Sequence, residues 1–440
     1  MTKKLFGTDG VRGVAGDEIT AELALALGRA AAAEVPADRP QVLLVRDTRE
    51  SGQMLESALA GGIAQAGGDA WLAGVLPTPA ASVLVRRHGL DLAVVISASH
   101  NPWRDNGIKF FGPDGGKLDG ALEERIEARV VESASDGGPP GEAGRVRALE
   151  GALDDYLREL SSYFQLDLKG RKVVLDCAHG ATYRAAPAIF ERLGAAVDVI
   201  GGDPDGRNIN EGFGSTHPEA LSERVVSTGA SLGFAFDGDG DRVIAVDAEG
   251  EVRDGDELIA LIARHLQEQG ELEGGVVVTV MSNYGFHQAM DEAAIGVATT
   301  PVGDRYVADA LSERDWRLGG EQSGHLIWTE FAPTGDGIAA ALLVTRSLGD
   351  RDLAGAVPMR KLPQVLRNVE VADRAAAERS TALAEAVERE NAALEGRGRV
   401  LVRPSGTEPL VRVMVEAPDV EECEAVCERL VGVVQNELGA

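Results

Sequence analysis

Short apolar runs alternate with longer amphipathic segments through roughly the first 350 residues of the chain. The runs at 41–47 and 91–99, QVLLVRD and DLAVVISAS, have the length and composition of buried strands. Between them, the segment MLESALAGGIAQAG at 54–67 repeats its apolar residues with the period of a helix. This alternation predicts βαβ units on a mostly parallel sheet.

The same pattern recurs after a stretch rich in Gly, Pro and Ser at about 133–146, which we interpret as a linker. The second set of predicted elements comprises helices at 153–164 and 184–194, a strand at 172–178 and a strand pair around 232–246. The third set follows the stretch at 252–266 and comprises a strand at 275–281 and a helix that leads to 317–328, and it ends near 357–364.

The last 75 residues follow a different order, in which two strands lie between two helices. Helices are predicted over 374–391 and 420–438, and strands over 398–405 and 410–417. The predicted fold class is therefore α/β, with three similar α/β domains that have mixed, mostly parallel sheets, followed by a small α+β domain. The predicted domains are 1–148, 149–250, 251–365 and 366–440.

The net charge and the length of the apolar runs exclude several classes of function. The formal net charge of -28 argues against a nucleic-acid or membrane-surface partner, because either would need a basic face. No apolar run approaches the ~20 residues of a membrane span, and residues 1–10 lack the apolar core of a signal peptide. We therefore expect a cytoplasmic monomer or homodimer.

Lysine is rare among the basic residues of this chain. Of the 43 basic residues only seven are lysine, so a lysine within a motif is more informative than an arginine would be.

The segment at 97–111, SASHNPWRDNGIKFF, places Ser99 beside His100 at the end of an apolar strand, with Lys109 further on. The G-x-S-x-G turn of serine hydrolases is missing. Ser99 therefore needs a reaction other than triad-based hydrolysis.

A second motif, FDGDGDRV at 236–243, alternates Asp237, Asp239 and Asp241 with glycines. Three carboxylates this close repel one another unless a cation joins them, so a hard divalent ion is the natural occupant. An EF-hand loop does not fit, because Arg242 stands where that loop needs its glycine and Ala248 where it needs its glutamate.

Two further loops carry polar groups suited to a phosphorylated sugar. The loop GGEQSGH at 319–325 offers Glu321, Ser323 and His325, which suit a polyhydroxylated ligand, although a polar surface turn would look similar. The loop RPSGTEPLVR at 403–412 forms a predicted phosphate cradle. Its members are Arg403, Ser405, Gly406, Thr407 and Arg412.

Together these loops indicate a phosphosugar phosphotransferase. Phosphoryl transfer needs mainly positioning and charge neutralisation, which explains why no hydrolase triad is required. Because this chain uses arginine at most basic positions, a lysine at position 109 indicates the need for a side chain that can lose its proton. A guanidinium effectively cannot do so. An ordinary salt-bridging lysine is the alternative, and His325 is a second acid/base candidate. His100 and Arg12 complete the predicted catalytic set.

Five motifs occur in the order and spacing of the α-D-phosphohexomutases, which the chain resembles over its whole length. They are FGTDGVRG (6–13), SASHNPWRDNGIKFF (97–111), DGDGDR (237–242), GEQSGH (320–325) and RPSGTEP (403–409). RDTRESG (46–52), NINEGFGSTHP (208–218) and TGDGIAAALL (334–343) extend the match.

The resemblance implies four domains around a central cleft and a catalytic phosphoserine at Ser99. It also implies that Asp237, Asp239 and Asp241, together with Ser99, hold one Mg²⁺. Sugar contacts would come from Glu321, Ser323 and His325, and the distal phosphate would be held by Arg403, Ser405, Gly406 and Thr407.

The expected reaction interconverts glucosamine 6-phosphate and glucosamine 1-phosphate through glucosamine 1,6-bisphosphate, since the motifs resemble the amino-sugar branch most. A phosphoglucomutase or phosphomannomutase is the alternative within the family. A metal-dependent serine phosphatase would share Ser99 and the aspartates but would not need the cradle at 403–412. A catalytically silent sugar-phosphate binder is disfavoured, because Ser99 and all three aspartates are intact.

Overall fold

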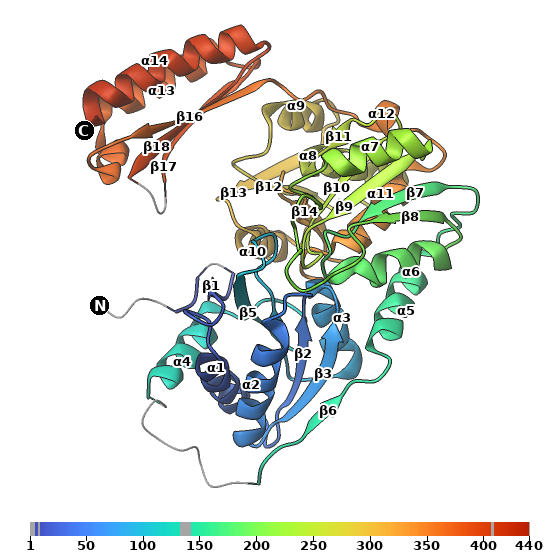
Figure 1. Ribbon diagram of the computed structural model, residues 1–440. Helices are drawn as coiled ribbons and strands as arrows, with labels where there is room; N and C mark the ends of the chain where they lie inside the picture. Colours follow the sequence, from blue (N-terminus) through green and yellow to red (C-terminus); the bar gives the residue numbers. More distant parts are fainter. Residues whose placement is uncertain (1–4, 8, 133–141, 406–408, 440) are drawn as a thin grey trace. The chain divides into compact units, whose positions relative to one another are not determined.

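The computed structural model describes residues 5–7, 9–132, 142–405 and 409–439 (Figure 1). The chain divides into two compact units, one of residues 1–281 and 297–357, and the other of residues 282–296 and 358–440. The larger unit holds three β-sheets and the smaller unit holds a fourth. Most of the predicted linker at 133–146 lies outside the described residues.

The first sheet has six strands in the order β1-β5-β4-β2-β3-β6. Strands β4, β2, β3 and β6 run parallel, whereas β5 is antiparallel to both β4 and β1. The strands are β1 (Val11–Val14), β2 (Gln41–Arg46), β3 (Asp69–Val75), β4 (Leu92–Ile96), β5 (Asp105–Phe111) and β6 (Val146–Ala148). The accompanying helices are α1 (Ala21–Glu34), α2 (Gly52–Gln65), α3 (Thr78–His88) and α4 (Gly120–Glu132).

Strand β4 shows why this sheet fixes the position of Ser99. All five of its residues are apolar and buried, as expected for a central strand covered on both faces. The chain leaves β4 at Ile96 and re-enters the sheet as β5 at Asp105, so Ser99 lies in the loop between them. Because β2 is parallel to β4, the residues after Arg46 emerge at the same edge of the sheet as this loop.

The second sheet has five strands in the order β11-β10-β9-β7-β8, with β10 antiparallel to β9. The three aspartates lie in the tight connection between β9 and β10. The strands are β7 (Lys172–Asp176), β8 (Ala196–Ile200), β9 (Leu232–Phe236), β10 (Val243–Asp247) and β11 (Val252–Arg253). The helices are α5 (Ala152–Phe164), η1 (Ala181–Tyr183), α6 (Ala185–Arg192) and α7 (Glu219–Thr228).

The third sheet has four strands in the order β13-β12-β14-β15. The loop 321–325 is the turn of the antiparallel pair β14–β15. The strands are β12 (Gly275–Thr279), β13 (Gly296–Thr300), β14 (Leu318–Gly320) and β15 (Leu326–Trp328). The helices are α8 (Gly255–Gln269), α10 (Asp304–Arg314), α11 (Gly337–Leu348) and α12 (Leu353–Ala356).

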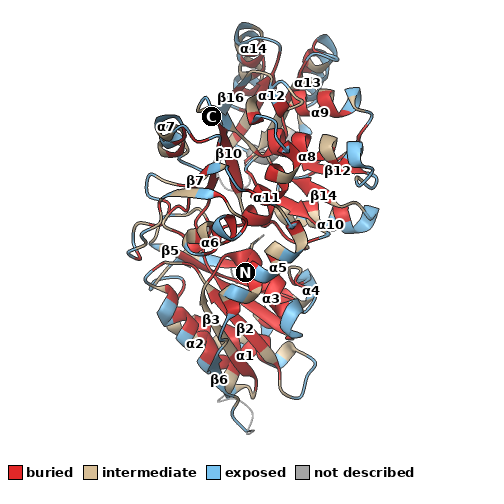
Figure 2. Cartoon of the chain, turned by 90° about the vertical axis from the view of Figure 1, so that its right-hand side faces the viewer, coloured by how far each residue is buried: buried red, intermediate tan, exposed pale blue. Residues whose placement is uncertain are grey.

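Helix α11 is buried on almost every side (Figure 2). Its sequence GIAAALLVTRSL is apolar around most of its circumference, which is typical of a helix that packs inside a large core. It contacts α8 and β15 as well as α5 and β10, so it lies between the second and third sheets. Asp336 caps its first turn by accepting a hydrogen bond from the backbone N–H of Ala339.

The smaller unit is an antiparallel sheet in the order β16-β18-β17, with helices packed on it. Its elements are α9 (Tyr284–Glu292), β16 (Gln364–Glu370), η2 (Arg374–Arg379), α13 (Thr381–Ala393), β17 (Arg399–Pro404), β18 (Leu410–Glu416) and α14 (Val420–Leu438). The prediction of one helix over 374–391 is wrong. A 3-10 turn ends at Arg379, and Ser380 then caps α13 through its hydroxyl.

The predicted fold class is confirmed, with mixed sheets and helices in the larger unit and an antiparallel α+β arrangement in the smaller one. Among the described residues, no helix combines the length and apolar character needed to cross a membrane.

Candidate active site

Ser99 lies at the end of β4 with its side chain directed to the acidic loop of the second sheet. Its hydroxyl donates a hydrogen bond to Asp237 Oδ2 at 2.6 Å, and the ring Nδ1 of His100 lies 3.4 Å from Ser99 Oγ. The backbone φ of Ser99 is 52°, a left-handed conformation that residues other than glycine rarely adopt. Such conformations persist where the surroundings hold them in place.

Asp237, Asp239 and Asp241 are all buried, and each offers an oxygen within 4.8 Å of the others. Asp239 Oδ1 and Asp241 Oδ1 have no hydrogen-bond partner among the described residues. Burial, followed by the charges of Asp241 and Asp239, raises the pKa of Asp237 well above its usual range. Three crowded oxygen donors with unused acceptors suit a hard divalent cation, so the cluster can hold a metal ion.

Lys109 reaches this cluster from the middle of β5. Its Nζ lies 2.9 Å from Asp239 Oδ2, 3.0 Å from Asp9 and 3.7 Å from Asp241. Burial alone would lower the pKa of Lys109, but the carboxylates of Asp239, Asp9 and Asp241 outweigh it and raise the pKa. Lys109 is therefore an ammonium group at neutral pH in this arrangement.

Lys117 and Asp304 complete a closed ring of alternating charges with these residues. Lys117 forms ion pairs with Asp9 and with Asp304, the first residue of α10. His325 lies between Asp304 and Asp241, with ring nitrogens 3.8 Å and 3.7 Å from the two carboxylates. The members in order are Asp304, Lys117, Asp9, Lys109, Asp241 and His325.

The two histidines of the site have opposite electrostatic environments. Burial alone would lower the pKa of His325, but the charges of Asp241 and Asp304 raise it. For His100, burial and the positive charges of Arg242 and Arg12 all lower the pKa. At neutral pH, His100 is therefore the uncharged imidazole of the site.

The remaining candidates of the larger unit surround this ring. Arg12 lies on β1 and forms an ion pair with Asp9. Glu321 is buried and its Oε1 accepts a hydrogen bond from the N–H of Gly303 at 3.0 Å. Ser323 is exposed at the tip of the β14–β15 turn. His325, Asp304 and Lys117 line a cavity of about 380 Å³ next to these groups.

The predicted phosphate cradle belongs to the smaller unit. Arg403 on β17 and Arg412 on β18 are directly paired across the two strands. Burial and the positive charge of Arg412 lower the pKa of Arg403. A bound anion would offset both effects by compensating the positive charge of the two guanidinium groups. Ser405 is buried and follows β17. Gly406 and Thr407 lie outside the described residues.

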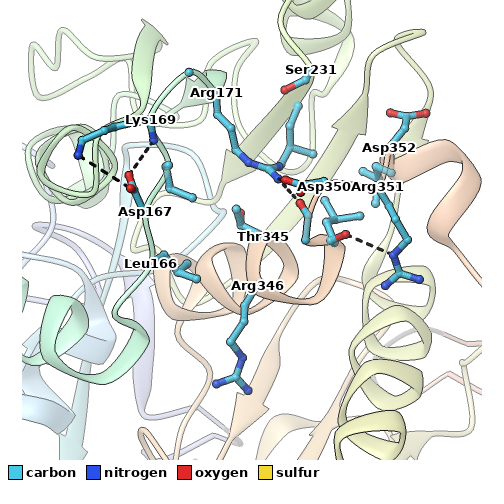
Figure 3. Close-up of a pocket in the computed structure, with 16 residues that line it drawn as sticks. Leu166, Asp167, Lys169, Arg171, Ser231, Thr345, Arg346, Asp350, Arg351 and Asp352 are labelled. Atoms are coloured by element: carbon cyan, nitrogen blue, oxygen red, sulfur yellow. Dashed lines mark hydrogen bonds and ion pairs between the residues drawn. The ribbon is translucent and has the colours of Figure 1, made fainter.

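A larger surface pocket of about 540 Å³ lies on the larger unit, between 166–171, 231–232 and 345–353 (Figure 3). None of the candidate residues lines it. Two ion pairs lie within the pocket, Lys169 with Asp167 at 3.9 Å and Arg171 with Asp350 at 3.6 Å (Figure 3). We therefore assign no part of the chemistry to it.

Three members of the charged ring were not predicted from the sequence. Asp9 lies within the motif FGTDGVRG, and Lys117 is one of only seven lysines, so composition could have marked it. Asp304 had no comparable signal, because its part in the ring depends on the packing of α10 beside the loop that carries Lys117.

Family models for phosphoglucomutase/phosphomannomutase match this chain along almost its whole length. The three α/β/α domain models match residues 3–136, 154–250 and 254–361, and the C-terminal domain model matches residues 366–433. The chain belongs to the phosphoglucomutase/phosphomannomutase family. It is therefore an enzyme of the phosphohexomutase type, an intramolecular phosphotransferase.

Curated relatives named phosphoglucosamine mutase are about half identical to this chain. The protein from Pelotomaculum thermopropionicum is 50% identical, with 98% of this chain and 99% of that protein covered. The relative from Moorella thermoacetica is 52% identical over 96% of this chain and 97% of its own. The relative from Mycobacterium marinum is 50% identical over 95% and 96%.

Solved structures share the fold at lower identity. A phosphoglucomutase/phosphomannomutase family protein from Burkholderia thailandensis has a TM-score of 0.82 at 24% identity and covers 100% of both chains. An N-acetylphosphoglucosamine mutase from Aspergillus fumigatus, solved with GlcNAc-6P and magnesium, has a TM-score of 0.66 at 18% identity, with 98% and 96% covered.

Proposed function

We propose that this chain interconverts glucosamine 6-phosphate and glucosamine 1-phosphate, with Ser99 as the phosphoryl carrier. The observation that carries the proposal is the hydrogen bond from Ser99 Oγ to Asp237, within a buried cluster of three carboxylates. A serine hydroxyl next to a cation-binding cluster suits phosphoryl transfer, which depends on positioning and charge neutralisation.

The reaction consists of two transfers at one place. In the first, the P–Oγ bond of phosphorylated Ser99 breaks and a P–O1 bond forms on glucosamine 6-phosphate, which gives the 1,6-bisphosphate. The sugar then turns over. In the second, the P–O6 bond breaks, the phosphoryl group returns to Ser99, and glucosamine 1-phosphate leaves. Each attacking hydroxyl releases one proton, and each leaving oxygen takes one back.

Lys109 is the group that we assign to this proton exchange, with His325 as the second candidate. The neighbouring carboxylates raise the pKa of both groups and so favour their protonated forms, from which each can give a proton to a leaving oxygen. Both belong to the charged ring, whose carboxylates can compensate for a change in protonation of either neighbour.

Asp237, Asp239 and Asp241, with Ser99, would hold one Mg²⁺. The buried oxygens of Asp239 and Asp241 that lack hydrogen-bond partners support this fit. When bound, the ion supplies neutralisation of the charge on the phosphoryl group. The residues of the chain hold and orient the reactants.

The two ends of the sugar are assigned to different loops. Glu321, Ser323 and His325 bind its hydroxyl groups. The cradle at 403–412 holds the phosphate that is not reacting, with the paired guanidinium groups of Arg403 and Arg412 supporting this assignment. Ser405, Gly406 and Thr407 complete the cradle.

The amino sugar is supported by the names of the relatives at about 50% identity. The test compares kcat/KM for glucosamine 6-phosphate, glucose 6-phosphate and mannose 6-phosphate under one set of conditions. We expect the highest value for glucosamine 6-phosphate and slow turnover of the others. A higher value for a neutral sugar would make the chain a phosphoglucomutase or phosphomannomutase instead.

The carrier role has a separate test. After incubation with glucosamine 1,6-bisphosphate, peptide mass spectrometry should place the phosphate on Ser99. The Ser99→Ala variant should fold but lose turnover. Full activity of that variant would end the proposal, and release of inorganic phosphate without isomerisation would favour a phosphatase.

A further inference from the structure

A fully buried arginine donates hydrogen bonds to the backbone of the loop that carries Ser99. Arg49 follows β2 at the edge of the sheet where β4 also ends, and its side chain has no exposed surface. A guanidinium group has five N–H donors in a fixed planar arrangement. All five are used: Nε donates to Asp47 Oδ2, Nη1 to the carbonyls of Pro102 and Asp105, and Nη2 to the carbonyls of Ser99 and Asn101.

A second side chain reaches the same loop from the second sheet. Asn210 lies in the segment after β8, and its amide Nδ2 donates to the carbonyl of Ser99 at 3.0 Å and to that of Asn101 at 3.1 Å. Both N–H groups of the amide are therefore used. The backbone φ of Asn210 is 62°, a left-handed conformation that asparagine adopts more easily than most residues.

These bonds leave no free acceptor position on the two carbonyls that flank His100. A carbonyl oxygen has two lone pairs, and those of Ser99 and Asn101 each accept one bond from Arg49 and one from Asn210. The N–H of Ser99 is also bound, to Ser97 Oγ at 3.0 Å. The peptide of Ser99 cannot rotate without breaking bonds to both side chains.

The direction of the Ser99 hydroxyl depends on this peptide. With φ at 52°, Oγ lies 2.6 Å from Asp237 Oδ2. Asp237 follows β9 in the sheet that also supplies Asn210. Arg49 therefore fixes the loop to its own sheet, and Asn210 fixes it to the sheet that carries the three aspartates.

We propose that Arg49 and Asn210 are positioning residues, which hold the Ser99 peptide in its left-handed conformation so that Oγ faces the aspartate cluster. The proposal rests on the proposed function, because it gives the two residues a role in the carrier's reaction. Both side chains bind the loop through its backbone carbonyls, so both act through the backbone of Ser99.

Asn210 offers the sharper test, because the buried Arg49 also contributes to the fold of the first sheet. Asn210→Gly removes the amide and keeps a residue that adopts the same positive φ without strain. Asn208→Gly is the matched control. Asn208 lies in the same segment and is half-buried, and among the described residues its side-chain amide bonds to the backbone of Asp203 and Asp205, both within that segment.

The measurements are kcat and KM for glucosamine 6-phosphate, the phosphate content of Ser99, and the melting temperature of each variant. A displacement of about 1 Å in a reacting group can cost about 10²-fold in rate, so we expect kcat of Asn210→Gly to fall by about that factor. KM should stay within about twofold, since the sugar contacts are intact. Asn208→Gly should keep kcat within about twofold of the wild type.

A further variant addresses Arg49. Arg49→Lys keeps the charge opposite Asp47 but cannot supply the bonds to all four carbonyls, so its kcat should fall although the charge is kept. A wild-type kcat in Arg49→Lys would show that charge alone matters and would contradict the proposal.

Three results would overturn the positioning role. They are an unchanged kcat in Asn210→Gly, an equal loss in Asn208→Gly, and a rise in KM that accounts for the whole effect. Failure of the proposed function would look different, because the wild type itself would then carry no phosphate on Ser99 after incubation with the bisphosphate, and both proposals would fall together.

Discussion

Lysine is used sparingly in this chain, and two of its seven lysines lie in one ring of charges. Lys109 and Lys117 are both largely buried and both contact Asp9. Arginine fills most other basic positions, including exposed ion pairs such as Arg224–Asp198. A lysine can exchange a proton and fits as a compact point charge between carboxylates, whereas a guanidinium requires room for a planar fork.

Lys109→Arg should lower kcat by at least about 10²-fold, because a well-placed general acid or base contributes about 10²–10⁴-fold and arginine keeps its proton. Steady-state kinetics with glucosamine 6-phosphate measures the effect. Lys169→Arg is the control, since the Lys169 side chain is 83% exposed and should leave turnover unchanged. Near-normal turnover of Lys109→Arg would mean that positive charge is all that this position supplies.

Helix α11 illustrates how a buried element depends on one capping group. Asp336 accepts hydrogen bonds from the hydroxyl of Tyr156 at 2.8 Å and from the N–H of Ala339 at 2.9 Å. Burial raises the pKa of Asp336 to about 6, and these hydrogen bonds only partly oppose that effect. The protonated carboxyl is therefore favoured in the folded chain relative to the unfolded one.

The sign of the resulting pH dependence follows from that shift. A carboxyl with a folded pKa of about 6 and an unfolded pKa near 3.8 contributes stability below pH 4. This contribution is lost as the pH rises to about 6. Asp336→Asn keeps an acceptor for Ala339 and Tyr156 but cannot ionise. Relative to the wild type, the variant should gain free energy of unfolding between pH 5 and pH 7, measured by urea denaturation. A difference that is independent of pH would contradict the role of burial.

Most elements of this chain could be predicted from the sequence, and the exceptions have physical causes. The central strand β4 is a continuous apolar run, and the helix α2 repeats its apolar residues with the period of a helix, because both face a core. The strand β16 was missed. It lies at the edge of its sheet, and only Val365 and Val369 among its seven residues are buried, so its apolar pattern is weak. The break at Ser380 depends on a capping hydrogen bond that helix periodicity does not reveal.

The site could be anticipated where its residues occur in short motifs. Ser99 and the three aspartates come from contiguous strings, and the structure brings them together at the edges of two sheets. Arg49 and Asn210 belong to the strings RDTRESG and NINEGFGSTHP, but nothing in those strings indicates that both bind the same carbonyls. That relation depends on tertiary packing alone.

At the scale of the larger unit, polar contacts join the three sheets. Thr78, the first residue of α3 beside the first sheet, donates to Asp239 at 2.6 Å, and Arg305 at the start of α10 pairs with Glu123 of α4. Lys117 bridges the first sheet to Asp304 on α10. The charged ring therefore connects elements of different sheets and is also part of the candidate site.

Lys117→Met should leave the carboxylates of Asp9 and Asp304 facing each other without their shared cation. Breaking a fully buried pair costs about 3–5 kcal/mol, and because these side chains remain partly exposed we expect about 2–3 kcal/mol in the free energy of unfolding. The double variant Lys117→Met/Asp304→Asn should recover part of that loss. Arg158→Met removes the exposed pair with Asp155 and should change stability by less than about 1 kcal/mol. Urea denaturation of the full chain provides all three values.

The immobility of the Ser99 peptide has a consequence for the shape of the substrate. In the proposed reaction, a carrier that cannot move requires each reacting hydroxyl to arrive at the same point in space, first O1 and then O6. When either hydroxyl arrives, the phosphate on the opposite end must reach the same cradle. The distance from O1 to the 6-phosphate must therefore match the distance from O6 to the 1-phosphate once the sugar is reversed. A pyranose comes close to satisfying this condition because O1 and C6 are carried by C1 and C5, the two carbons that flank its ring oxygen. A sugar phosphate in which these two distances differ strongly should accept a phosphoryl group from Ser99 but should not return one to it.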